Sequence, residues 1–343
     1  MKKLDLKLKI LTKCLSCTLC FLILVQPMTG QDMHFSQFER NSLMLNPAFT
    51  GYIEGSYRFH LHFRNQWYNL ADNGVYNTPS ASFDLNIGMK ESHSSYGIGL
   101  VVAKDYSGSG AFEHLVGLLS LSYHLGLDAF EKYFLSIGVQ GGVYQKKLDF
   151  TKLTFESQFN GFEIDPGIGA MENFQREEVI QPNFRAGVTW SSYFSEKMRV
   201  IVGAAYMNML EADETFLERN NLPSRLVVHL DVGISVVSRV DLSFLLLYMK
   251  QSGVQQTNAG VVLEYNFPRD YSFSIGGGIR NKDAAIGRFG LGFKGFDIHF
   301  SYDMTTSDLN AFNDGIGAFE LSLTYTGNFK KAEKPIMPAI RFF

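Results

Sequence analysis

The sequence predicts an all-β protein, a single transmembrane antiparallel β-barrel of about fourteen strands with both termini in the periplasm. Three observations indicate this fold. Long segments alternate apolar and polar residues, only 19% of the residues are charged, and 14% are aromatic. Soluble domains usually carry about 25% charged residues. No stretch is long and apolar enough for a transmembrane helix, which needs about 20 residues.

Residues 1–30 read as a secretory signal peptide. Five lysines precede an apolar stretch from Cys14 to Val25, and residues 28–30 offer a cleavage site. The apolar stretch is too short to span a bilayer. The three cysteines, at positions 14, 17 and 20, would be removed with this segment. Their loss would exclude disulfides, thiolate metal sites and cysteine nucleophiles from the mature chain.

The mature chain is mildly acidic. Removing five Lys and one Asp with the signal peptide leaves 26 of 31 basic and 33 of 34 acidic side chains, a formal net charge of −7. Binding to nucleic acid requires a basic surface, so we expect no nucleic-acid partner. The partners expected instead are the lipid of the outer membrane and other proteins.

The segment from Tyr57 to Trp67 shows the strand pattern most clearly. Phe59, Leu61 and Phe63 alternate with polar residues, so these three side chains are expected to face lipid and their neighbours the lumen. Each predicted strand has about ten residues or more, which suits a tilted membrane strand. The predicted strands are residues 56–67, 80–90, 95–104, 113–125, 132–146, 182–191, 198–208, 224–237, 239–249, 257–267, 271–280, 285–294, 295–304 and 317–326.

The connections between these strands are expected to alternate in length. The odd-numbered connections are mostly the longer ones, and residues 147–181 form by far the largest. Bacterial outer-membrane barrels combine short periplasmic turns with long outer loops. An even number of strands would then leave both termini in the periplasm.

The predicted lumen carries charges of both signs, which indicates internal ion pairs and a filled lumen. Fourteen strands lie between the eight that leave room only for side chains and the sixteen that leave a channel. The organisation expected is a signal peptide (1–30), a periplasmic leader or possible plug (31–55), the barrel (56–326) and a periplasmic tail (327–343). The leader and the tail are the candidates for filling the lumen.

Three motifs give the sequence a resemblance to a known family. The leader reads Gln31-Asp-Met-His-Phe-Ser-Gln-Phe and then Leu45-Asn-Pro-Ala-Phe-Thr-Gly51, and the first strand ends Phe63-Arg-Asn-Gln-Trp67. This order resembles the PorP/SprF family of outer-membrane proteins, tied to the type IX secretion system and gliding motility of Bacteroidetes. The likeness continues at Tyr302-Asp303 and around Glu320. Members of this family often have Gly-Ser-His-Glu where this chain has Gly317-Ala-Phe-Glu320.

The same motifs have a physical interpretation. Asn46-Pro47 favours a turn, and Gly51 can release the chain into the first strand. Arg64 and Gln66 face inward and could donate to carbonyls of a folded-in leader; contact with a partner protein is the alternative. The candidate structural or partner residues are Asn46, Pro47, Gly51, Arg64, Gln66, Trp67, Tyr302, Asp303 and Glu320.

No pattern in the chain favours catalysis, a cofactor or a metal. His60 and His62 share a strand face, but Arg58 and Arg64 beside them would repel a cation. Asp303, with two later aspartates, is expected in an outer loop that could meet calcium, although the spacing misses the EF-hand pattern. A Gly-x-Ser-x-Gly elbow is absent from the sequence. Glycines within the strands are interpreted as relieving curvature or crowding.

The function implied by the resemblance is that of a non-enzymatic barrel of the type IX secretion system. It would sit in the cell outer membrane and anchor periplasmic or surface components of the machinery. It would also support export or surface attachment of cargo proteins such as gliding adhesins. The alternative is a passive or substrate-specific outer-membrane channel, which a conductance measurement would distinguish.

Overall fold

A computed structural model describes residues 32–68, 76–88, 93–107, 111–129, 132–153, 155–165, 167–168, 176–195, 197–214 and 221–329. The chain divides into two units, Met1–Asp32 and Met33–Phe343. The first unit lies almost entirely outside the described residues, as do the predicted signal peptide and most of the predicted C-terminal tail. All structural statements below concern the second unit.

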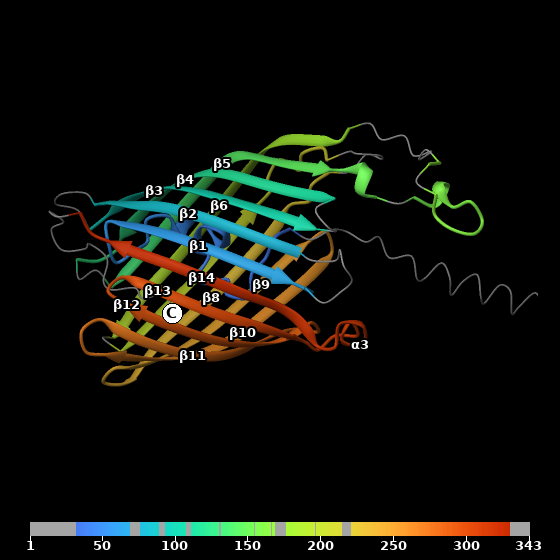
Figure 1. Ribbon diagram of the computed structural model, residues 1–343. Coiled ribbons are helices and arrows are strands. Elements are labelled where there is room, and N and C mark those ends of the chain that lie inside the picture. Colours follow the sequence, from blue (N-terminus) through green and yellow to red (C-terminus); the bar gives the residue numbers. More distant parts are fainter. Residues whose placement is uncertain are drawn as a thin grey trace, which may run out of the picture. The chain divides into compact units, whose positions relative to one another are not determined.

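The described residues form a closed antiparallel barrel of fourteen strands in which each strand pairs with its neighbours in sequence and β1 pairs with β14. Figure 1 shows the strands inclined side by side around this barrel. The strands are β1 (Tyr57–Gln66), β2 (Tyr76–Gly88), β3 (Ser95–Ser107), β4 (Phe112–Gly126), β5 (Tyr133–Leu148), β6 (Glu178–Ser195), β7 (Met198–Met207), β8 (Arg225–Val237), β9 (Val240–Gln251), β10 (Val254–Phe267), β11 (Tyr271–Arg280), β12 (Ala284–Phe293), β13 (Phe296–Thr305) and β14 (Ile316–Gly327).

The predicted barrel and its strand register are confirmed. Phe59, Leu61 and Phe63 are 41%, 39% and 36% exposed on the outer face, whereas His62 and Arg64 are each 2% exposed inside. The closed sheet pairs its backbone groups internally, which a membrane requires because lipid offers no hydrogen bonds. Among the described residues, no helix is long and apolar enough to cross a membrane.

The two ends of the barrel differ in their connections, although less regularly than expected. At the end where β1 finishes, residues 149–177, 208–224 and 306–315 form long connections. At the other end the connections are short. The third, ninth and eleventh connections, residues 108–111, 252–253 and 281–283, belong to the first end but are also short, so the expected alternation is wrong there. The ninth is short because β9 and β10 extend farther than the sequence pattern indicated.

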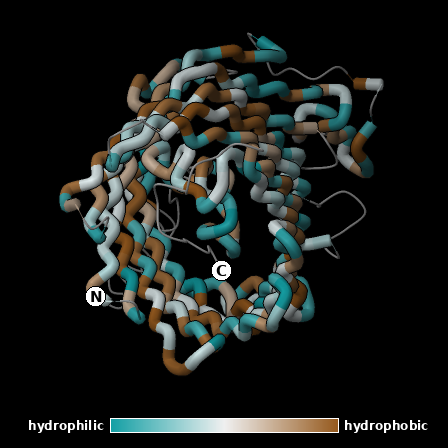
Figure 2. Tube along the Cα trace, turned by 90° about the vertical axis from the view of Figure 1, so that its left-hand side faces the viewer, coloured by the Kyte–Doolittle hydropathy of each residue, from teal (hydrophilic) through white to brown (hydrophobic). Residues whose placement is uncertain are grey.

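The leader, described from Met33, lies inside the barrel. Every residue from Phe35 to Ile53 is buried. The leader forms a short helix α2 (Ser42–Leu45) and a 3₁₀ turn η1 (Pro47–Phe49). Figure 2 looks along the barrel from the end where β1 begins and shows this coiled segment within the ring of strands. The lumen is therefore largely filled by the chain's own N-terminal segment.

Candidate functional site: the leader inside the lumen

Asn46 and Pro47 form the turn that the sequence predicts. The side-chain oxygen of Asn46 accepts a hydrogen bond of 2.9 Å from the backbone N–H of Ala48, and Pro47 opens η1. Proline suits this first helical position because its fixed φ is compatible and no N–H is needed there. The Asn46 amide also donates to the carbonyl oxygens of Val188 and Ala204, at 3.2 and 3.1 Å. Asn46 thus caps the turn and fixes it to β6 and β7.

Three strand glycines form a cradle for this part of the leader: Gly97 of β3, Gly138 of β5 and Gly187 of β6. A Cβ on Gly138 would lie 2.4 Å from the carbonyl oxygen of Pro47, and one on Gly187 would lie 2.0 Å from Oδ1 of Asn46. A Cβ on Gly97 would lie 1.9 Å from the carbonyl oxygen of Thr50. These glycines let the leader backbone approach the wall closely. The sequence analysis expected strand glycines to relieve crowding but did not identify the leader as the neighbour.

The N-terminal part of the leader is bound by Glu320 of β14. Its two carboxylate oxygens accept hydrogen bonds from the backbone N–H groups of Ser36 and Gln37, at 2.6 and 2.8 Å. Arg64 of β1, directly opposite Glu320 in the strand register, forms an ion pair with the same carboxylate. Glu320 is fully buried. A buried charge needs such partners because it has lost its hydration.

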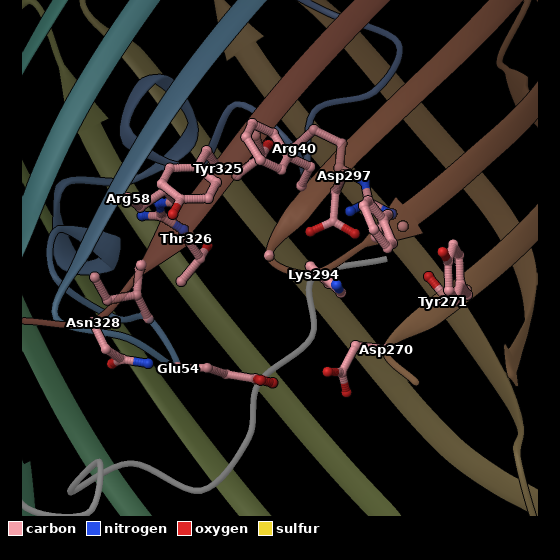
Figure 3. Close-up of a pocket in the computed structure, with 18 of the residues that line it drawn as sticks. Arg40, Glu54, Arg58, Asp270, Tyr271, Lys294, Asp297, Tyr325, Thr326 and Asn328 are labelled. Atoms are coloured by element: carbon pink, nitrogen blue, oxygen red, sulfur yellow. The ribbon is translucent and has the colours of Figure 1, made fainter. Parts of the chain in front are cut away.

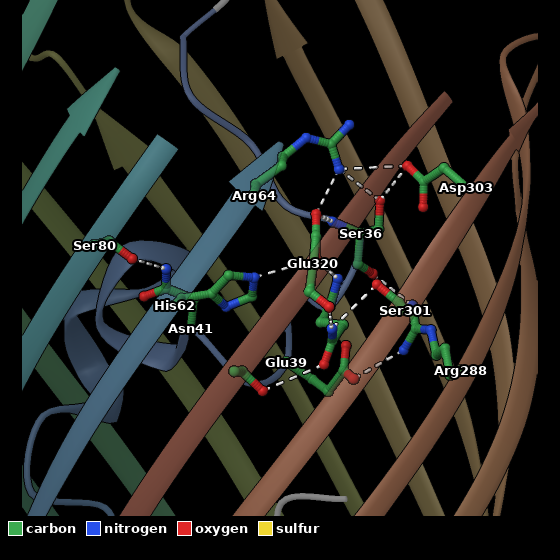
Figure 4. A network of polar contacts seen from close by, with 12 residues as sticks. Ser36, Glu39, Asn41, His62, Arg64, Ser80, Arg288, Ser301, Asp303 and Glu320 are labelled. Atoms are coloured by element: carbon green, nitrogen blue, oxygen red, sulfur yellow. Dashed lines mark hydrogen bonds and ion pairs between the residues drawn. The ribbon is translucent and has the colours of Figure 1, made fainter. Parts of the chain in front are cut away.

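The hydroxyl of Ser36 lies at the centre of a second set of charges. It donates to Asp303 Oδ2 at 2.6 Å and accepts from Nη1 of both Arg64 and Arg280, each at 2.9 Å. Arg280 also pairs with Asp303 at 2.8 Å. We call Ser36, Arg64, Arg280, Asp303 and Glu320 the latch. Figure 4 shows Arg64, Asp303 and Glu320 converging on Ser36 of the leader.

The latch corrects two expectations about the candidate residues. Asp303 lies in β13 and is fully buried in ion pairs, so it is not part of an outer loop. Arg64 donates to the hydroxyl of Ser36 and to carboxylates, not to leader carbonyls. Gln66 only accepts from Arg64, at 3.2 Å from Nη2. Other residues donate to leader carbonyls; among them, Arg288 contacts the oxygen of Ser36 at 2.6 Å and pairs with Glu39 at 2.8 Å.

Gly51 ends the leader at a further charged contact. Its φ of +69° belongs to the left-handed region that glycine adopts without strain. Its N–H donates to Asp84 of β2 at 2.7 Å, and Asp84 is paired with Arg58 at 2.8 Å. This arrangement agrees with the predicted release of the chain into the first strand.

The remaining candidates lie away from the leader. Tyr302 belongs to the outward-facing set of β13, between lumen-facing Ser301 and Asp303. Trp67 follows β1 with a φ of 56°, and its ring centroid lies 5.3 Å from that of Tyr76. Among the described residues, no group of histidine and carboxylate side chains could hold a metal ion.

The wall formed by β7 to β10 contacts the leader mainly through apolar side chains. Phe38 and Phe49 of the leader belong to one buried cluster with Ile201, Leu245 and Leu247 of this wall. Tyr52 belongs to the same cluster. This side of the lumen therefore resembles the core of a soluble protein.

A cavity of about 500 Å³, here called the vestibule, lies between the leader and β10 to β14 at the short-turn end. Figure 3 shows Glu54, Asp270, Lys294 and Asp297 around it. Its lining carries four acidic residues and three basic ones. The acidic residues are Glu54, Glu264, Asp270 and Asp297, and the basic residues are Arg40, Arg58 and Lys294. The leader thus fills the lumen incompletely, and this cavity is lined largely by polar and charged residues.

Sequence reasoning missed several residues that hold the leader. Ser36, Glu39, Arg288 and the cradle glycines were not selected as candidates. Arg288 stands among glycines in β12, where a charged residue on a membrane strand indicates the lumen face. Alternation alone predicted that such side chains point inward, but it could not say which part of the chain they meet.

A closed barrel with an apolar, aromatic outer face and a charged, plugged lumen is an outer-membrane β-barrel. The sequence profile of the type IX secretion system membrane protein PorP/SprF matches residues 28–325, so the chain belongs to this family, as the resemblance predicted. No curated protein matches the chain significantly.

Solved outer-membrane barrels share the architecture. The toluene transporter TodX of P. putida superposes with a TM-score of 0.52 at 11% identity, over 85% of this chain and 95% of its own. The monoaromatic hydrocarbon channel CymD gives 0.48 at 12% identity, over 85% and 94%. A Pseudomonas aeruginosa FadL homologue gives 0.48 at 12%, over 83% and 94%. At these identities the likeness concerns the fold alone.

Proposed function

We propose that this barrel is a plugged anchor of the type IX secretion system. It holds periplasmic or cell-surface components and supports export or surface attachment of cargo proteins such as gliding adhesins. The observation that carries this proposal is the latch: Glu320 binds two leader N–H groups while paired with Arg64. A lumen closed by buried ion pairs suits a protein that binds partners better than one that passes solutes.

The orientation follows from the connections. Outer-membrane barrels direct short turns to the periplasm and long loops outward. We therefore assign the vestibule and the turns 238–239, 268–270 and 294–295 to the periplasmic side, and the connection 149–177 to the cell surface. Periplasmic components would meet the first surface, and cargo the second.

We also propose that the barrel has no catalytic role. Its buried ionisable side chains bind one another and the leader: Arg58 pairs with Asp84, Arg199 with Asp231, and Arg288 with Glu39. A catalytic acid or nucleophile needs freedom to react with a substrate. These groups already serve as structural partners.

A deletion strain tests the proposal. We expect loss of at least one large surface protein from the surface proteome, together with normal uptake of small solutes. Complementation with the unchanged protein should restore surface display. Normal surface proteins with impaired solute entry would reject the secretion role in favour of the channel.

Conductance gives a second, independent test. The vestibule is the one observation that favours a channel, because it opens part of the lumen. We expect the purified protein to give no ion current in planar bilayers. A current in the unchanged protein would support the channel, and current seen only in a Glu320→Gln variant would indicate that the latch closes the lumen.

A further inference from the structure

The leader starts at the end of the barrel where the long connections lie. The carbonyl oxygen of Met33 accepts a hydrogen bond of 3.0 Å from Nη1 of Arg225. Arg225 is the first residue of β8 and pairs in register with Met207, the last residue of β7. Met33 therefore lies beside the strand ends joined by the long connection 208–224.

The end of β14 lies at the opposite end of the barrel. Gly327 pairs with Tyr57, the first residue of β1. Beyond it, the N–H of Phe329 donates to the Ser56 hydroxyl at 3.2 Å. Since β1 has ten residues, it extends for roughly 33 Å. The two described ends of this unit are thus separated by the length of the barrel.

The contacts along the leader show that it begins at one end of the lumen and leaves it at the other. Ser36 lies at the level of Arg64, near the end of β1. The Asn46 amide contacts His229 within β8, and Gly51 contacts Asp84, which is opposite Arg58 at the start of β1. Because the number of strands is even, β1 begins and β14 ends at the same end of the barrel. The leader, however, enters the lumen at the opposite end and crosses it before β1 begins.

We infer that the start of the leader opens on the cell surface, whereas the end of β14 opens on the periplasm. This differs from the expectation that both termini are periplasmic, and it rests on the proposed function only for the orientation of the barrel. Met33 and His34, which are partly exposed, then face the outside of the cell and not the periplasm. The latch keeps them there, because Ser36 and Gln37 are bound by Glu320 immediately after them.

Thiol labelling in intact cells tests this inference. The sequence has no cysteine beyond position 20, so single cysteines can be placed against little background. His34→Cys reports on the start of the leader and Asn328→Cys on the end of β14. Phe162→Cys reports on the longest connection, where the native side chain is 97% exposed. Ala48→Cys, at a buried leader position, is the control for folding.

With a small membrane-impermeant thiol reagent, we expect labelling of His34→Cys and Phe162→Cys in intact cells. Asn328→Cys should react only after the outer membrane is permeabilised, and Ala48→Cys only after denaturation. Labelling of Phe162→Cys with protection of His34→Cys until permeabilisation would overturn the inference and leave the orientation intact. Labelling of Asn328→Cys with protection of Phe162→Cys would show that the barrel is reversed, which overturns both.

Discussion

The two walls of the lumen hold the same leader by different means. Strands β11 to β14 and β1 present charged side chains, and the leader meets them through the ion pairs and hydrogen bonds of the latch. Strands β7 to β10 present Ile201, Leu245 and Leu247, which pack on leader aromatics. The charged wall gives directional contacts that select one position of the leader. The apolar wall excludes water and tolerates small changes in side-chain shape.

The largest effect is expected on the charged wall. Glu320→Gln keeps the shape of the side chain but removes one of the two carboxylates that pair with the buried Arg64, so that only Asp303 remains. Breaking a buried pair in this way costs roughly 3–5 kcal/mol. The free energy of unfolding, measured with denaturant in detergent, should fall by that amount.

The control is Glu113→Gln at the ion pair of Lys104 and Glu113, whose side chains are 30% and 32% exposed. Partly exposed pairs contribute only about 0–1 kcal/mol. Equal losses for the two variants would mean that the latch is not the main constraint on the leader.

The comparison also depends on which face of each strand lines the lumen. Leu61→Arg places a charge on the outer face near the middle of β1. On a lipid-facing position near the midplane this costs roughly 2–4 kcal/mol. The same denaturation in lipid vesicles should show the loss, whereas Leu61→Phe should change little. If both variants behaved alike, the register of β1 would be wrong by one residue.

A smaller effect is expected in the glycine cradle. Gly138→Ala adds a Cβ only 2.4 Å from the backbone of Pro47, so the leader must move. Such overpacking usually costs about 1–3 kcal/mol. Gly117→Ala in β4 is the matched control, because nothing lies within 4 Å of its added Cβ. Protease digestion of the leader should accelerate in the first variant only; similar rates would argue against the close approach.

The sequence predicted the barrel well and its contents only in part. Alternation on β1 and β13 is clear because one face meets lipid and the other meets charges. On β7, Ile201 and Ala205 face the leader while Val202 and Tyr206 face outward. Both faces are apolar there, so the pattern does not reveal an apolar lumen wall. Likewise, Ser36 looks like any surface serine until the fold brings Glu320 and Asp303 to it.

The smallest effect should be the coupling between the two parts of the leader. Arg64 contacts Ser36, whereas Asn46 contacts β6 and β7. Among the described residues, the side-chain hydrogen-bond partners of Arg64 and those of Asn46 do not overlap. Energies of such independent sites usually add within about 0.3–0.5 kcal/mol.

A double-mutant cycle of Arg64→Ala and Asn46→Ala measures this coupling through unfolding free energies. Arg64→Ala with Glu320→Gln serves as the positive control, because residues in one network couple by about 0.5–3 kcal/mol. Additivity in the first cycle and coupling in the second would show that the leader is held at two independent places. Strong coupling in both would mean that the leader moves as one rigid body, so that release of the latch also frees the turn.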